Sequence, residues 1–112
     1  MNLKKLKANL EKAKKVNGVK VVADVSTRHI ERQDALRLDT GGELISRIGG
    51  YMYGWFISTH NARHALGRQA LKEAGFSETY IELLKTFVDM EVYYVCLDQD
   101  APVIEGLKSH EW

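Results

Sequence analysis

The fold is decided by residues 44–59, which read LISRIGGYMYGWFIST. Two strand-like runs flank Gly49-Gly50, and glycine tolerates the positive φ angles of the tight turns that join antiparallel strands. The sequence therefore predicts a β-hairpin with its turn at these two glycines. Beyond the turn, both faces of the run 51–59 are largely apolar, which predicts a central strand.

The sequence predicts two further strands, one before and one after this hairpin in the chain. Residues 19–25 (VKVVADV) are rich in β-branched side chains and apolar at nearly every position after Lys20, which favours a second central strand. Residues 91–97 form the last long strand, and the acidic stretch 98–102 ends it.

Helical patterns fill the rest of the chain. Apolar spacings of three and four predict helices at residues 1–17, 27–38 and 61–75, and from 78 onward. The best start signal belongs to the last of these helices. Ser77 suits its N-cap, and Phe76 is expected to pack on Ile81 as a hydrophobic staple.

This order of elements predicts a single α+β domain over residues 1–112. A lysine-rich helix at 1–17 is appended to an α+β core at 19–112, and that core reads as a ferredoxin-like β-α-β-β-α-β sandwich. The alternative is a partly parallel sheet in which the first and last strands run side by side in the same direction. Only in that alternative do residues 27–29 and 98–100 meet at one end, where ligands usually bind.

Composition indicates a folded cytoplasmic protein. Apolar residues make up 45% of the chain and charged residues 28%, and no run is long enough to span a membrane or form a signal peptide. The net charge of +1 hides a strong asymmetry, because residues 1–20 carry +6 and residues 73–112 carry −7. Such asymmetry indicates a polarised surface suited to a charged partner or to a homodimer.

Few residues suggest chemistry. Asp98 and Asp100 flank Gln99 at a strand end, a pattern that fits either a magnesium or calcium site or an aspartate-rich turn. His60 and His64 have helical spacing but lack an assured third metal ligand. No nucleophile motif or phosphate loop accompanies them. We therefore expect no catalytic residue, no bound metal and no cofactor.

Several segments resemble an uncharacterised family of small bacterial proteins encoded on prophages, plasmids and genomic islands. The segments are STRHI (26–30), YGWFI (53–57), GFSE (75–78), LDQDAPVIEGL (97–107) and EW (111–112). Residues 1–17 lie outside the resemblance, and Gln99 and Ala101 depart from the smaller, glycine-containing turn of the family. The resemblance implies mobile-element biology and brings no catalytic residue with it.

Three functions follow as hypotheses. The first is a non-enzymatic accessory protein that binds a host or element protein, for instance to inhibit a host defence system. The second is nucleic-acid binding by the lysine-rich helix, and the third is a metal-dependent hydrolase centred on Asp98 and Asp100. The candidate binding residues are Lys4, Lys5, Lys7, Lys12, Lys14, Lys15, Asp98, Asp100, Glu105 and Trp112.

Overall fold

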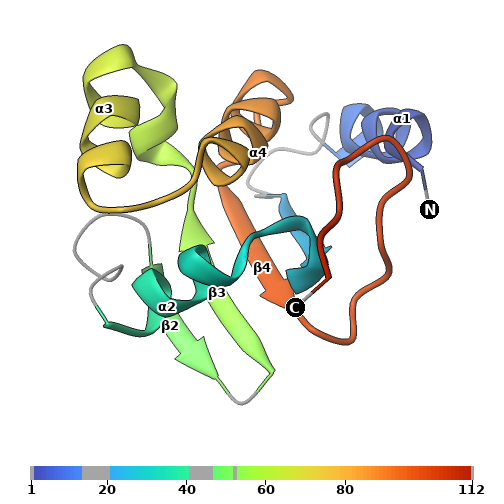
Figure 1. Cartoon of the computed structure of the whole chain (residues 1–112). Helices are drawn as coiled ribbons and strands as arrows, with labels where there is room; N and C mark the ends of the chain where they lie inside the picture. The colour runs from blue at the N-terminus through green and yellow to red at the C-terminus, as the bar shows by residue number, and fades with distance from the viewer. Residues whose placement is uncertain (1, 14–20, 41–46, 52, 112) are drawn as a thin grey trace.

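A computed structural model describes residues 2–13, 21–40, 47–51 and 53–111, which form an α+β fold around one mixed sheet (Figure 1). The helices are α1 (Leu3–Ala13), α2 (Arg32–Thr40), α3 (Ala65–Glu73) and α4 (Glu78–Asp89), with 3-10 turns η1 (Thr27–His29) and η3 (His60–Arg63). The strands are β1 (Val22–Ser26), β2 (Arg47–Tyr51), β3 (Gly54–Ser58) and β4 (Tyr94–Asp98). Within the described residues, no helix is long and apolar enough to cross a membrane.

The sheet has the order β1-β4-β3-β2, which corrects the ferredoxin-like prediction. β1 runs parallel to β4, whereas β4 with β3 and β3 with β2 are antiparallel. β3 is central, as predicted, but β1 lies at an edge of the sheet. Asp24 is exposed in the middle of β1, and a charged side chain there is compatible with an edge strand.

The hairpin is present, but its predicted turn is wrong. Gly49 and Gly50 lie inside β2 and pair with Phe56 and Trp55, while Tyr51 pairs with Gly54, so the chain reverses later than expected. The ladder shifts register between Arg47 and Gly49. Glycine in a strand often marks such an irregularity, which explains why the pair resembled a turn in the sequence.

The start of α4 confirms the predicted cap. The Ser77 hydroxyl accepts a hydrogen bond from the Tyr80 N–H, and Glu78 occupies the first turn. Phe76 stacks on Tyr80 with ring centroids 4.4 Å apart, and Phe76 and Ile81 belong to the same buried cluster. Local sequence signals thus fix this helix end.

The predicted helix over 61–75 is two pieces, η3 and α3, separated by an extended His64. The pieces pack so closely that a Cβ on Gly67 would overlap the backbone carbonyl of Asn61. Gly67 is therefore a packing requirement, although glycine lowers helix propensity.

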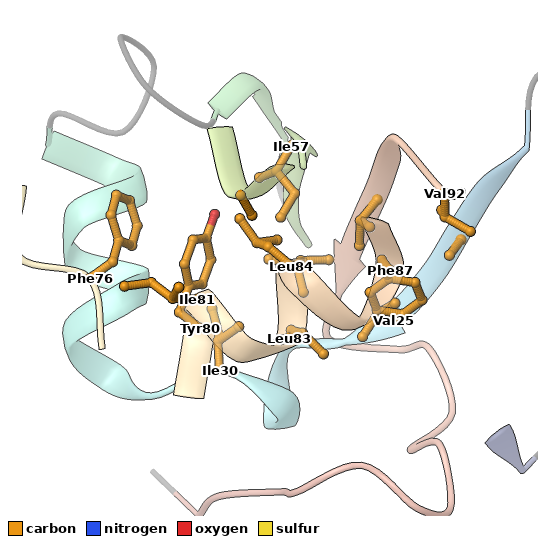
Figure 2. Close-up of a cluster of buried hydrophobic side chains, with 14 of the residues drawn as sticks. Val25, Ile30, Ile57, Phe76, Tyr80, Ile81, Leu83, Leu84, Phe87 and Val92 are labelled. Carbon is orange, nitrogen blue, oxygen red and sulfur yellow. The ribbon is translucent and has the colours of Figure 1, made fainter. Parts of the chain in front are cut away.

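One hydrophobic core lies between the helices and one face of the sheet. Ala23, Val25, Ile57, Val95 and Leu97 supply the sheet face and belong to the same cluster as the buried residues of α2, α3 and α4. Tyr80, Leu84 and Phe87 of α4 are fully buried there. Figure 2 shows these α4 side chains beside Val25 and Ile57.

Candidate binding site

The parallel pairing of β1 and β4 brings two distant segments to one edge of the sheet. Ser26 at the end of β1 lies opposite Asp98 at the end of β4. The chain then continues as η1 on one side and as residues 99–111 on the other. Ligands of open α/β sheets commonly bind outside the carboxyl ends of parallel strands, so this edge is the first place to look for a site.

The buried His29 fastens the C-terminal segment to this edge. Its ring is 1% exposed, with Nδ1 2.7 Å from the Lys108 carbonyl oxygen and Nε2 2.8 Å from the backbone nitrogen of Ile104. The Ile104 N–H can only donate, so Nε2 accepts and Nδ1 carries the proton that is donated to Lys108. Both ring nitrogens of His29 are therefore committed to holding the chain.

Two further contacts complete the path of this segment. The His110 N–H donates to the Arg28 carbonyl at 2.7 Å, and the Leu3 N–H donates to the Glu105 carbonyl at 2.9 Å. Gly106 has a φ of 98°, a left-handed conformation that suits glycine. Figure 1 shows the segment reaching α1 and then returning toward the tip of β4.

The acidic turn after β4 is built by backbone bonds. Asp98 Oδ1 accepts the Asp100 N–H at 2.8 Å, and the Asp98 carbonyl accepts the Ala101 N–H at 3.2 Å. This geometry matches the aspartate-turn interpretation of the sequence. Within the described parts of the chain, no three His, Cys, Asp or Glu residues are grouped so that they could hold a metal ion.

A polar pocket of about 470 Å³ lies where the two segments meet. Its lining residues are Thr27, Arg28, Gln99, His110 and Glu111. The Nε2 atom of His110 is buried and has no hydrogen-bond partner. We call this cavity the carboxyl-end pocket, and its volume falls in the range of ordinary ligand sites.

None of the five pocket residues was among the candidate binding residues, but the parallel alternative for the sheet predicted that residues 27–29 and 98–100 meet at one end, and the structure confirms that alternative. Arg28 lies in the STRHI segment of the family resemblance and His110 directly precedes its EW segment, and the structure brings these two parts of the chain together. Of the predicted candidates, Asp98 and Asp100 border the pocket residue Gln99 in the chain. Glu105 is exposed and contributes its backbone to the contact with α1.

The lysine candidates form a separate surface. Lys4, Lys5, Lys7 and Lys12 are exposed on α1, whose Leu10 is buried in the core. α1 lies away from the tip of β4 (Figure 1). Lys14, Lys15 and Trp112 lie outside the described residues.

A second buried polar group, Asp34, joins the starts of two helices. Its Oδ2 accepts the Glu31 N–H at 2.9 Å and the Ser77 hydroxyl at 2.7 Å, and its Oδ1 accepts the Ser77 N–H at 2.7 Å. Glu31 precedes α2 and Ser77 caps α4, so one carboxyl group holds both helix ends. Neither residue pattern nor spacing indicated this contact in the sequence.

Burial raises the pKa of the Asp34 carboxyl above its ordinary value of 3.8, while the hydrogen bonds from Ser77 and Glu31 act in the opposite direction. With a raised pKa, the folded protein keeps the proton at pH values where the unfolded chain has lost it. The stabilising contribution of protonation is thus fully present below 3.8 and is lost as the pH rises through the folded-state pKa.

Comparison with known proteins identifies a family and no function. No curated protein and no solved structure matches the chain. Residues 22–112 match the family described as "Family of unknown function (DUF5983) C-terminal domain". The match begins at the first residue of β1, so α1 precedes it. Because it covers most of the chain and both segments that form the pocket, the protein belongs to this family of unknown function.

Proposed function

We propose that this protein is a non-enzymatic accessory protein of a phage or other mobile element, and that it binds a host or element protein through the carboxyl-end pocket. The observation that carries the proposal is the exposed Arg28 side chain in that pocket, together with His110 on the same lining, whose buried Nε2 has no hydrogen-bond partner. A buried polar atom without a partner is uncommon in a folded protein, and a bound protein would satisfy this one if binding turned the His110 ring into the pocket. The family resemblance supports the mobile-element setting, and cytoplasmic proteins are the proposed targets.

The use of the other polar groups favours binding over catalysis. Both ring nitrogens of His29 form hydrogen bonds with backbone atoms, and Asp98 accepts a hydrogen bond from the backbone of its own turn. Asp34 and Ser77 bond to each other inside the fold. A general base needs a nitrogen or oxygen within reach of a substrate proton, and these groups are already engaged in holding the structure.

A matched pair of arginine variants tests the proposal. Both Arg28 and Arg32 are exposed, but only Arg28 lines the pocket. We expect tagged wild-type protein and Arg32→Glu to capture the same stoichiometric partner from isotope-labelled bacterial lysate, and Arg28→Glu to lose it. Equal capture by Arg28→Glu, with thermal unfolding unchanged, would overturn the proposal.

The exposed face of α1 favours nucleic-acid binding as a second candidate function. Lys4, Lys5 and Lys12 are exposed on a helix anchored by its leucines, and among the described residues no ion pair engages them. Lysines held in this way can neutralise phosphates, and the affinity would fall with added salt. A Lys4→Glu/Lys5→Glu/Lys12→Glu variant should lose a salt-sensitive gel shift seen with wild type. The absence of any wild-type shift at low salt would exclude this function.

A further inference from the structure

The polar groups of the carboxyl-end pocket also indicate what chemical group enters it. We infer that the pocket receives a carboxylate of the partner, an inference that rests on the proposed function for the identity of that partner as a protein. The two groups that carry it are the Arg28 guanidinium and the imidazole of His110.

The Arg28 guanidinium is available as a donor. Arg28 is exposed at the pocket, and no ion pair or hydrogen bond holds its guanidinium within the described chain. The main chain of Arg28 is fixed, because its N–H donates to Ser26 Oγ at 3.1 Å and its carbonyl accepts from His110 at 2.7 Å. The same backbone contact holds the main chain of His110 beside Arg28, and the buried Nε2 of His110 has no hydrogen-bond partner. The backbone of the site is therefore fixed before the ligand binds.

The charges around the pocket select a singly charged group. Arg28 is the cation of the lining, and Glu111 is a carboxylate on the same lining. Asp98 and Asp100 flank the lining residue Gln99 in the chain. A phosphate dianion would add two charges to a region with one guanidinium and several carboxylates. A carboxylate adds one charge, and its two oxygens match the guanidinium fork.

The carboxylate can come from an acidic side chain or from the end of a protein chain. These two sources differ in the neighbouring group, because a chain terminus carries an amide N–H close to its carboxylate. Glu111 lines the pocket and can accept such an N–H. The shared chemistry is the carboxylate, and small probes separate the two sources.

The test is a titration of the full-length, ¹⁵N-labelled protein at constant ionic strength. The probes are acetate, N-acetylglycine, the neutral N-acetylglycine methylamide and inorganic phosphate. We expect both carboxylates to give saturable shifts of the Arg28, Gln99 and His110 amide signals, and the methylamide to give none. Arg28→Gln should weaken acetate binding about tenfold or more, as expected for a lost charge-assisted bond, whereas Arg32→Gln should not change it.

Tighter binding of N-acetylglycine than of acetate would assign the source as a chain terminus, and equal binding would assign it as a side chain. Stronger binding of phosphate, equal shifts with the methylamide, or unchanged binding by Arg28→Gln would overturn the inference. The titration needs no partner protein. If the titration fails but capture from lysate still depends on Arg28, the carboxylate inference is overturned and the proposed function stands. If the carboxylates bind but capture does not depend on Arg28, the proposed function is overturned and the carboxylate inference stands.

Discussion

Replacing His29 by alanine should loosen the C-terminal segment that forms half of the pocket. The change removes two hydrogen bonds, of 2.7 Å to Lys108 and 2.8 Å from Ile104. Each is worth about 1 kcal/mol net, and leaving the Ile104 N–H buried without a partner adds roughly 1–3 kcal/mol. His29 is almost fully buried, so a cavity also forms. Together these terms predict a loss of about 3–5 kcal/mol or more in the free energy of unfolding.

Two measurements check this expectation. Urea denaturation followed by circular dichroism gives the free energy of unfolding, and amide hydrogen exchange of Ile104 reports on the segment itself. Ile104 is 1% exposed and its N–H bonds directly to His29, so its protection should fall in His29→Ala more than that of amides in the middle of β4.

An exposed histidine provides the control. His64→Ala removes a side chain that makes no capping hydrogen bond at the start of α3, and it should change stability by less than about 0.5 kcal/mol. If His29→Ala behaves like His64→Ala and leaves Ile104 protected, His29 does not hold the segment.

Three further changes address other parts of the fold. Asp34→Asn should lower the free energy of unfolding by roughly 1–3 kcal/mol. Because burial raises the pKa of Asp34, this loss, measured by urea denaturation, should be larger near pH 4 than at pH 7. A larger loss at pH 7 would contradict the sign of the pKa shift. Gly67→Ala should destabilise the protein by about 1–3 kcal/mol, although alanine has the better helix propensity, because the new Cβ would overlap the Asn61 carbonyl. A higher melting temperature for this variant would refute the close packing of η3 on α3. Gly106→Ala should weaken the contact of the C-terminal segment with α1, because the φ angle of residue 106 is 98° and the new Cβ would lie 3.3 Å from Leu3 Cβ. Unchanged amide hydrogen exchange in α1 would contradict this prediction.

Local signals predicted the parts of the fold that depend on neighbouring residues. Ser77 and the adjacent Glu78 predict the start of α4 from neighbouring residues alone, and the structure confirms that the helix starts there. The Gly49-Gly50 pair was misread because glycines suit both a tight turn and an irregular strand. The edge position of β1 depends on its pairing with β4, which is remote in the sequence.

The candidate site depends on contacts that no local pattern encodes. His29 meets Ile104 and Lys108 across 75 and 79 positions, and Asp34 meets Ser77 across 43. The sequence singled out Asp98 and Asp100 because two nearby carboxylates resemble a metal site. The structure uses Asp98 in a turn and gathers Arg28 and His110 beside it. The parallel alternative for the sheet was the one sequence hypothesis that brought these segments together.

The claim that the carboxyl ends of β1 and β4 form the binding site is tested most directly by mapping amide shifts of the labelled protein in complex with its captured partner. The largest changes should fall on Thr27, Arg28, Gln99, His110 and Glu111, which line the pocket. Changes concentrated on α1 or on the β2–β3 hairpin, with these five signals unmoved, would contradict it.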